Sequence, residues 1–565
     1  MEVTSRLKQF GLHNLTQSPA ITKSKIRVVF NAWTIVASFI AAMVLLPIVV
    51  LIVLSIDSDL SIWQHLANTV LSDYLKTTFL LLIGVAFFST ILGVSSALIV
   101  SHFDFIGARF FTWALVLPLA TPAYITAYAY TGLLDVAGPM QTHIRQVFDL
   151  QVGDYWFPQM RSLGGAIFVL SFVLYPYIYL LARSAFAEQS ASLNNAAKTL
   201  GQSQFQSFLK VTIPIARPAI FAGLALVLME TLADYGAVSY FGLSTFTTGI
   251  FRTWYGLDSV NTAAQLAITL LCFVIVILFL EKSARRRAAF YSHANTNKAN
   301  KIRLNGFYQG LAIFALSLPL LLGFIIPSGQ LLIWALPQAD QFIQASYFSL
   351  LRNTLLLASI TSILAILFAM ILVYSQRLNP SKLNLLAKSV AGLGYAVPGL
   401  IIAIGVLVPL GWFDNTLDAW LRASFGISSG LLLSGSIAAL VIAYLVRFLA
   451  LAINSVESGL AVVQPAMDQS ARSLGLSSFA TIRRVHLPLM RASVLSGMLI
   501  VFVDVMKELP ATLVLRPFNF NTLAVRAYEL ASDERLADAA LPSIAIVVAG
   551  LIPIIFLTRI MTSDN

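Results

Sequence analysis

A series of long apolar runs constrains this 565-residue chain more than any other feature of its sequence. A helix of roughly 20 apolar residues crosses a hydrocarbon layer of about 30 Å, whereas membrane barrels have weaker alternating segments of about 10 residues. The sequence therefore predicts an all-α integral membrane protein with about twelve spanning helices. They lie near residues 32–56, 76–101, 109–133, 163–182, 217–240, 262–280, 306–326, 352–375, 386–410, 430–452, 492–514 and 541–559.

Composition and charge agree with a membrane environment. Hydrophobic residues make up 58% of the chain and charged residues 11%, so we expect membrane lipids to surround it. The net charge of +11 is spread over short loops, which predicts no nucleic-acid partner. Lys and Arg precede the first run and fill the segment between the sixth and seventh runs, whereas the loops at 57–74 and 327–350 have neither. Both termini should therefore be cytoplasmic.

The two halves of the chain repeat one another. The string LKTT at Leu75 matches LRNT at Leu351, and Pro122 matches Pro398 at the same offset along the chain. Later matches share a second, slightly shorter offset: Gly201 with Gly475, Pro214 with Pro488, Asp234 with Glu508, and Arg252 with Arg526. A short deletion between Pro398 and Gly475 explains the change of offset.

Six spans separate equivalent positions, and because six is even the repeats should be parallel, related by a pseudo-twofold axis along the membrane normal. We expect a first transmembrane repeat with a cytoplasmic tail at 1–280, a basic cytoplasmic linker at 281–305 and a second transmembrane repeat at 306–565.

Two matched cytoplasmic loops join the fourth to the fifth run and the tenth to the eleventh. They read NAAKTLGQSQFQSFLKVTIPIARP and QSARSLGLSSFATIRRVHLPLMRA, each with Gly thirteen residues before Pro. Each indicates a short helix, a turn at Gly, a second amphipathic helix, and Pro where the chain enters the next span. One such loop would be an ordinary connection, but two copies indicate a docking surface for a cytoplasmic motor.

These loops resemble the "EAA" loops of permease subunits in binding-protein-dependent ABC importers, which implies a type I importer fold. The resemblance implies that the loops dock onto two copies of an ABC ATPase subunit and that an external solute-binding protein delivers cargo. Neutral amides, Asn195 and Gln469, replace the family's Glu, so contacts that need its charge are not implied. The residues matching the motif are Asn195, Ala196, Ala197, Gly201 and Pro214, then Gln469, Ser470, Ala471, Gly475 and Pro488.

The chain should not be an enzyme. It contains no GxxxxGK[ST] string for cradling phosphates, so ATP hydrolysis should belong to the separate subunit. We expect no cofactor in this chain, with ATP and Mg bound by the partner.

Two acidic pairs lie inside apolar runs, where charges are costly and mark functional candidates. Glu230 and Asp234 are one helical turn apart, and Asp504 and Glu508 are their equivalents in the second half. The four carboxylates should converge on the pseudo-twofold axis, as part of a substrate pathway or gate that includes Tyr235. Carboxylate and phenolate oxygens suit a hard metal cation, so transient iron contact is a hypothesis for all four, although we predict no firm metal site.

A structural alternative stays open for these carboxylates: Asp504 could pair with Lys507, and the others could be neutralised by Arg252, Arg516 or Arg526.

The strings LADYGAVSYFGLSTFTTGIFRTWYG and KELPATLVLRPFNFNTLAVRAYELASDERLADAALP resemble the corresponding stretches of fused twelve-span ferric-ion permeases. This resemblance implies import of ferric ion through the bacterial cytoplasmic (inner) membrane. Related permeases carry thiamine, phosphonate, sugar phosphate or polyamine, and these remain alternatives. An ion-coupled secondary transporter is a rival, but it has no motor to dock, and a non-transporting scaffold would need neither duplicated feature.

Overall fold

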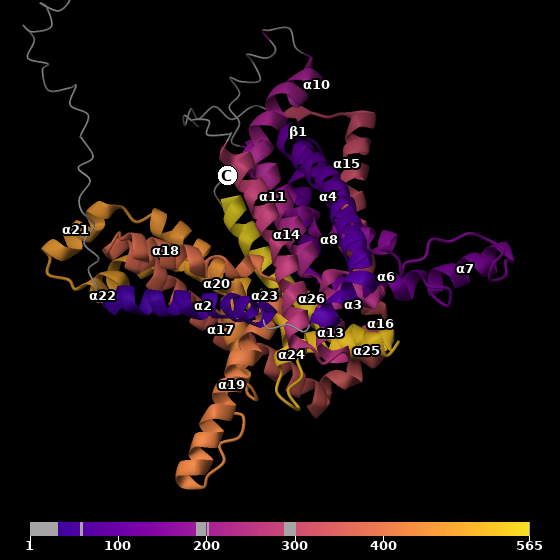
Figure 1. Cartoon of the computed structure of the whole chain (residues 1–565). Helices are drawn as coiled ribbons and strands as arrows, with labels where there is room; N and C mark the ends of the chain where they lie inside the picture. The colour runs from indigo at the N-terminus through magenta and orange to yellow at the C-terminus, as the bar shows by residue number, and fades with distance from the viewer. Residues whose placement is uncertain (1–31, 57–59, 188–198, 200–202, 287–300, 564–565) are drawn as a thin grey trace, which may run out of the picture.

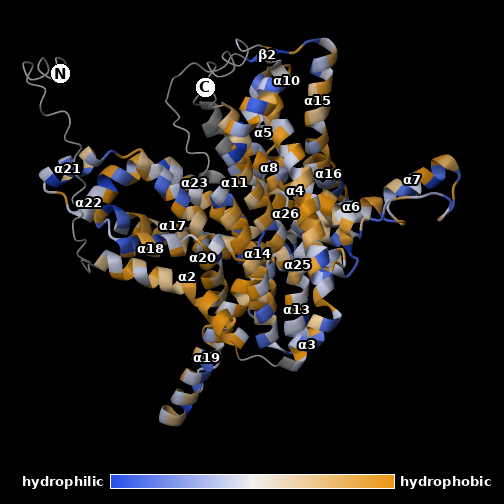
Figure 2. Cartoon of the chain, turned by 45° about the horizontal axis from the view of Figure 1, so that its top comes forward, coloured by the Kyte–Doolittle hydropathy of each residue, from blue (hydrophilic) through white to orange (hydrophobic). Residues whose placement is uncertain are grey.

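The computed structural model describes residues 32–56, 60–187, 199, 203–286 and 301–563, and it is almost entirely helical there. Eleven helices in these ranges are long and apolar enough to cross a membrane, or twelve when one bent pair is counted as a span. Hydrophobic residues predominate along the long helices of the centre, whereas the projecting helix α7 carries both hydrophilic and hydrophobic residues (Figure 2). The expected all-α membrane fold is confirmed.

The first repeat runs from α2 to α14. Its helices are α2 (Ala32–Ile56), α3 (Leu60–Thr69), α4 (Leu71–His102), α5 (Ala108–Ala114), α6 (Ala123–Leu134), α7 (Pro139–Phe148), α8 (Leu163–Ala187), α10 (Gln204–Ser207), α11 (Ile213–Ala233), α12 (Gly236–Tyr240), α13 (Phe246–Gly256) and α14 (Val260–Arg286). A 3-10 turn, η1 (Leu117–Ala120), precedes α6, and a π turn, η2 (Phe208–Thr212), precedes α11.

The second repeat follows the same order. Its helices are α15 (Gly306–Leu320), α16 (Ile326–Ala335), α17 (Ala345–Leu378), α18 (Lys382–Ala391), α19 (Gly399–Phe425), α20 (Ile437–Ala461), α21 (Pro465–Ser473), α22 (Ser478–Thr481), α23 (Leu487–Met506), α24 (Pro510–Leu515), α25 (Leu523–Ser532) and α26 (Leu536–Ser563). Shorter turns are η3 (Leu321–Ile325), η4 (Leu336–Ile343), η5 (Gly394–Ala396) and η6 (Ile482–His486). Strand β1 (Phe103–Asp104) pairs in parallel with β2 (Ile302–Arg303), which joins the end of α4 to the start of the second repeat.

The first span of each repeat packs against the other repeat. Helix α2 lies on α17, α18 and α19, and the segment from α15 to α16 contacts α4, α8 and α6. Glycine permits the closest approaches, because a Cβ on Gly405 would lie 2.5 Å from the Pro47 carbonyl oxygen, and one on Gly323 would lie 2.5 Å from that of Phe172. The exchanged helices interlock the two repeats.

Two of the expected spans are broken near their middle. The spans expected at 109–133 and 386–410 are interrupted just before Pro122 and Pro398, which occupy the N-cap positions of α6 and α19. In the first repeat the two parts meet at 90°. Proline disfavours helical conformation in the residue before it and supplies no N–H, so each span bends at this point.

Two further spans end earlier than expected. The sequence predicted helices through 240 and 514, but α11 ends at Ala233 and α23 at Met506. Each is followed by a short break and then by α12 or α24. The prediction was wrong because apolar composition continues through the break.

The repeats diverge at one end of the molecule. Figures 1 and 2 show α10, which precedes α11, and α21, which precedes α23, at well-separated extremities. Helices α7 and α19 project from other parts of the structure (Figure 1). We refer to the end of each repeat that carries α10 or α21 as the loop end, and to the opposite end as the far end.

Candidate functional site

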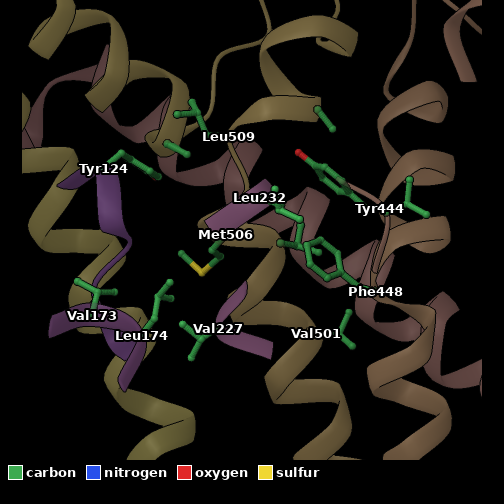
Figure 3. Packing of buried hydrophobic residues seen from close by; sticks show 14 of the residues in the cluster. Tyr124, Val173, Leu174, Val227, Leu232, Tyr444, Phe448, Val501, Met506 and Leu509 are labelled. Atoms are coloured by element: carbon green, nitrogen blue, oxygen red, sulfur yellow. The ribbon is translucent and has the colours of Figure 1, made fainter. Parts of the chain in front are cut away.

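A polar cavity of about 120 Å³ lies between the two repeats. Its wall comes from η1, α6, α8 and α11 of the first repeat and from η5, α20 and α23 of the second. Apolar side chains from both repeats flank it, including Leu174 and Phe448, which occupy equivalent positions in the two halves (Figure 3). The cavity is therefore shared by equivalent surfaces of the two repeats.

Four carboxylates line this cavity, namely Glu230, Asp234, Asp504 and Glu508. They are the two acidic pairs of the sequence, brought to one place by the ends of α11 and α23. Glu230 and Asp504 lie within these helices, whereas Asp234 and Glu508 lie just beyond their last residues. Tyr235 also lines the cavity and is buried.

Asp234 and Glu508 also explain how the chain breaks after α11 and α23. Oδ1 of Asp234 accepts hydrogen bonds of 3.0 and 3.1 Å from two backbone N–H groups of α12. The Glu508 carboxylate accepts two of 3.1 Å from backbone N–H groups of α24. The first N–H groups of a helix have no intrahelical acceptor, and a negative charge is favourable there. Asp234 and Glu508, which are equivalent in the two repeats, thus stabilise equivalent helix breaks.

Two cationic side chains offset the carboxylates of the second repeat. Lys507 Nζ lies 2.7 Å from Asp504 Oδ1, and Arg447 Nη1 lies 3.1 Å from Glu508 Oε1. The Glu508 side chain is only 1% exposed, so the arginine and the α24 N–H groups together compensate a deeply buried charge. The Asp504–Lys507 pair is the one that the spacing in the sequence had suggested.

The first repeat lacks these cations. At the positions equivalent to Lys507 and Arg447, the first half of the chain has Ala233 and Val173. Glu230 accepts instead a 2.8 Å hydrogen bond from the hydroxyl of Tyr395, which reaches it from the second repeat. Among the charged groups that line the cavity, four are carboxylates and two are cations, and both cations belong to the second repeat.

The three arginines considered as partners for the carboxylates lie elsewhere. Arg516 and Arg526 approach Glu529 at 2.8 and 3.7 Å, and Arg252 Nη1 lies 3.5 Å from the hydroxyl of Ser244. The hypothesis that they neutralise the cavity carboxylates was wrong, because Arg252 lies in α13, and Arg516 and Arg526 follow α24 and approach Glu529 instead.

Sequence reasoning missed Arg447 and Tyr395. Arg447 is a charge within the apolar string IAALVIAYLVRFLALAIN, which is a signal for a functional or paired residue in a membrane span. The comparison of repeats overlooked it because its equivalent is an apolar valine. Tyr395 gave no such signal, since its equivalent, Leu119, is an ordinary apolar residue.

Several contacts join the repeats at the far end. Arg161, before α8, forms a 2.7 Å ion pair with Glu534, before α26, and its guanidinium lies 5.0 Å from the ring centroid of Tyr240. The hydroxyls of Ser239 and Tyr528 are 3.2 Å apart. These contacts hold the two repeats together at the far end.

The loop that contains α21 has the predicted turn. Gly475 adopts a left-handed φ of 75°, and backbone N–H groups of residues 475 and 476 bond to carbonyls in the last turn of α21. Gln469 and Ser470 are exposed on this helix, Ala471 is buried beneath it, and Leu474 is 81% exposed beside the turn.

Pro488 lies in the first turn of α23. A continuous helical segment runs from Ser478 to Met506, with the π turn η6 directly before α23. Proline lacks an N–H donor, and the wider π turn accommodates it without breaking the helix. Pro214 follows the π turn η2 in the same way. Of the first loop, Asn195, Ala196, Ala197 and Gly201 lie outside the described residues.

In the described ranges no group of three or more His, Cys, Asp and Glu side chains is arranged to hold a metal ion. Each of the four cavity carboxylates has the separate hydrogen bonds or ion pair described above.

Two parallel helical repeats that share one polar cavity define a duplicated membrane transport protein. The family described as "Binding-protein-dependent transport system inner membrane component" matches residues 89–288 and again residues 365–563. The chain belongs to this family. It is thus a multi-pass inner-membrane permease of the ABC importers, a transport component with one family match in each half.

Two relatives match across both repeats, and a third matches over a smaller part of the chain. The chain is similar to the Fe(3+)-transport system permease protein FbpB 2 of Haemophilus influenzae, with 25% identity over 504 residues, 86% of this chain and 90% of that protein. FbpB 1 of the same organism is 21% identical over 541 residues, covering 88% and 81%. The sulfate transport system permease protein CysT of Escherichia coli is 28% identical over 203 residues, 36% of this chain and 70% of CysT.

Proposed function

We propose that this chain is the permease subunit of an ATP-driven importer that moves ferric ion across the bacterial inner membrane into the cytoplasm. The observation that carries the proposal is the carboxylate-lined cavity shared by the two repeats. The similarity to FbpB 2, which is named as an Fe(3+)-transport permease and matches over 86% of this chain, supports the choice of cargo.

The charges of the cavity favour a cation. Four carboxylates face two cationic groups, so an anion such as sulfate, phosphonate or sugar phosphate would meet net repulsion. Carboxylate and phenol oxygens suit a hard, highly charged metal ion. Thiamine and polyamines are also cations, and only the similarity to FbpB 2 separates them from iron.

The pathway charges are unequal between the repeats. Asp504 and Glu508 already have Lys507 and Arg447 beside them, so their charges are largely offset. Glu230 and Asp234 are bonded by neutral donors only, from a phenol and from backbone N–H groups. We infer that a passing cation is attracted chiefly to the first-repeat side of the cavity. Tyr235, which lines the same wall, completes the proposed pathway or gate.

Transport would be driven from the loop end. We propose that the two loops receive two copies of an ABC ATPase subunit, which binds the ATP and Mg, and that both termini are cytoplasmic. The exposed face of α21 and the exposed Leu474 support a docking role for the second loop. An external binding protein would deliver ferric ion at the far end.

The arrangement of the repeats supports an inward-facing state. They separate at the loop end and are joined at the far end by the Arg161–Glu534 and Ser239–Tyr528 contacts (Figure 1). ATP binding would draw the motor subunits together, close the loop end and release the far-end contacts.

The proposal is tested with purified permease, ATPase and binding protein in proteoliposomes. Uptake of radiolabelled ferric ion is compared with that of sulfate, thiamine, a phosphonate, a sugar phosphate and a polyamine, with ATP or a non-hydrolysable analogue inside. We expect ATP-dependent uptake of ferric ion alone. Uptake of another solute would overturn the cargo, and uptake driven by an ion gradient without ATP would favour a secondary transporter.

A further inference from the structure

The helix that precedes Gly475 is tied to three long helices of the second repeat by one cluster of polar side chains. We call this cluster the α21 clamp; it consists of Tyr374 and Arg377 of α17, Asp468 of α21, and His486 of η6. It lies outside the carboxylate cavity and has no part in the proposed cargo pathway.

Arg377 is the centre of the clamp. Its Nε and Nη2 both lie 2.8 Å from Asp468 Oδ2, and its guanidinium also donates to the carbonyls of Leu460 and Val463 at 3.3 and 2.9 Å. Leu460 lies in the last turn of α20 and Val463 just beyond it. A planar guanidinium with several fixed donors can hold such an arrangement, whereas a lysine cannot. One side chain therefore joins the ends of α17 and α20 to α21.

The opposite oxygen of Asp468 meets the span that follows. Asp468 Oδ1 lies 2.6 Å from His486 Nε2, and His486 Nδ1 lies 2.8 Å from the hydroxyl of Tyr374. The Tyr374 and His486 rings also stack, with centroids 5.5 Å apart. The cluster is largely buried, since the side chains of Arg377 and Asp468 are only 18% and 21% exposed. Asp468 is therefore attached to helices on both sides of its loop.

The first repeat cannot form this clamp. The positions equivalent to its four members, found with the same two repeat offsets, have neutral side chains throughout. These equivalents are Leu98, Ser101, Asn194 and Thr212. The two loops therefore differ in the side chains available for such a clamp, although their Gly-to-Pro spacing is the same.

We propose that the α21 clamp makes the second loop a stiff lever, so that the two ATPase copies act on unequal loops and the stroke is transmitted mainly through the second repeat. This inference rests on the proposed function. Without the clamp, α21 keeps its chain connection through residues 462–464, the packing of the buried Ala471 and the turn at Gly475, but it loses the ion-paired contacts to α17 and η6. The helix could then move more independently of the spans. Asp468 and Arg377 are positioning residues in this proposal, because they contact neither cargo nor nucleotide.

The sharpest variant is Asp468→Asn, which gives the second loop the residue type that the first loop has at Asn194. In the reconstituted complex we expect two ATPase copies and ATP hydrolysis to be retained, while ferric ion moved per ATP falls about fivefold or more. Arg377→Gln should have the same effect, the double variant should be no worse than either, and Asp468→Glu should restore part of the coupling. The matched control, Asn194→Ala, should leave the ratio unchanged.

An unchanged ratio in Asp468→Asn would overturn the clamp, as would additive losses in the double variant. Loss of ATPase copies from Asp468→Asn would also overturn it, because Asp468 would then be a docking contact. An equal loss in Asn194→Ala would remove the asymmetry. Failure of the unsubstituted complex to hydrolyse ATP or move cargo would instead refute the proposed function, before any variant is compared.

Discussion

The hydroxyl of Tyr395 donates a 2.8 Å hydrogen bond to Glu230 across the boundary between the two repeats. Tyr395 lies in η5, directly before the break at Pro398, and Glu230 lies one turn before the end of α11. The bond therefore connects a broken span of one repeat to the acidic helix end of the other. Any motion that separates the repeats at the cavity must break it.

Removing this bond should impair transport. A hydrogen bond to a charged group contributes about 1.5–3 kcal/mol, so Tyr395→Phe should slow ATP-driven ferric ion uptake by about tenfold if the bond stabilises a state of the transport cycle. The matched control is Tyr124→Phe, because Tyr124 also lines the cavity but its hydroxyl makes only a 3.4 Å contact with a backbone carbonyl. Equal uptake by the two variants would contradict this prediction.

Arg447 should be needed for stability. Breaking a buried pair leaves an uncompensated charge, and Arg447→Met should destabilise the protein by about 3 kcal/mol. The α24 N–H groups remain on Glu508, so Arg447→Met with Glu508→Gln should recover part of the loss. Arg526→Met is the control, since its pair is exposed and its distance to Glu529 is 3.7 Å. Melting temperatures in detergent measure all three, and an Arg447→Met value equal to the control would exclude a supporting role.

The repeat in the sequence was sufficient to predict where the four carboxylates lie. Two parallel repeats place equivalent residues around one axis, so Glu230 and Asp504 had to approach each other once the register was known. The same register could not identify Arg447 or Tyr395, because each interacts across the repeats or along its own repeat while its equivalent is apolar. A contact between residues at non-equivalent positions of the two repeats cannot be found by comparing equivalent positions.

The helix breaks and the packing of each first span against the other repeat also could not be predicted from the sequence. Asp234 looks like one more residue of an apolar helix until its bonds to α12 are seen. The contact of Gly405 with Pro47 joins segments far apart in the chain, and many glycines in membrane helices have no such role. Composition and hydrophobic periodicity describe one helix at a time, whereas these features depend on contacts with a second segment of the chain.

The first-repeat carboxylates should matter most for cargo. Asp504→Asn with Lys507→Met removes one charge of each sign and leaves the cavity's net charge unchanged, so uptake should be largely retained. Glu230→Gln with Asp234→Asn removes two charges that form no ion pair within the described residues, and uptake should fall about tenfold or more while the two ATPase copies still bind. The side-chain amide oxygen introduced by Asp234→Asn can still accept hydrogen bonds from the α12 N–H groups. Initial rates of ferric ion uptake test this prediction. A larger loss in Asp504→Asn with Lys507→Met would show that the second-repeat residues matter more for cargo.

The far-end contact should depend on pH. The hydrogen bond from Arg161 lowers the pKa of Glu534 below its usual value of 4.5. A lowered pKa in the folded state gives a stabilisation that is present above the unfolded pKa and is lost as the pH falls through the folded one. Because the two side chains are 38% and 61% exposed, the contribution should stay below about 1 kcal/mol.

Melting temperatures of the unsubstituted protein and of Arg161→Ala should therefore differ slightly at pH 7 and converge as the pH falls below the lowered pKa of Glu534. Arg535→Ala is the control, because Arg535 pairs with Asp538 three residues away and does not join the repeats. A difference that persists at low pH would show that Arg161 acts through its contact with the Tyr240 ring instead.

The turn at Gly475 should be necessary for coupling to the motor. Its φ of 75° is a left-handed conformation that costs a β-branched residue at least about 1–2 kcal/mol, so Gly475→Val should displace α21 relative to the span that follows. We expect the variant to insert normally and to lose uptake. Gly430→Val is a matched control, because Gly430 has a φ of 60° and equally open surroundings, but lies in the loop after α19. Both variants carry comparable backbone strain, so only Gly475→Val should reduce ATP-driven ferric ion uptake. Normal uptake in Gly475→Val, or equal loss in both variants, would refute the assignment of this turn to motor coupling.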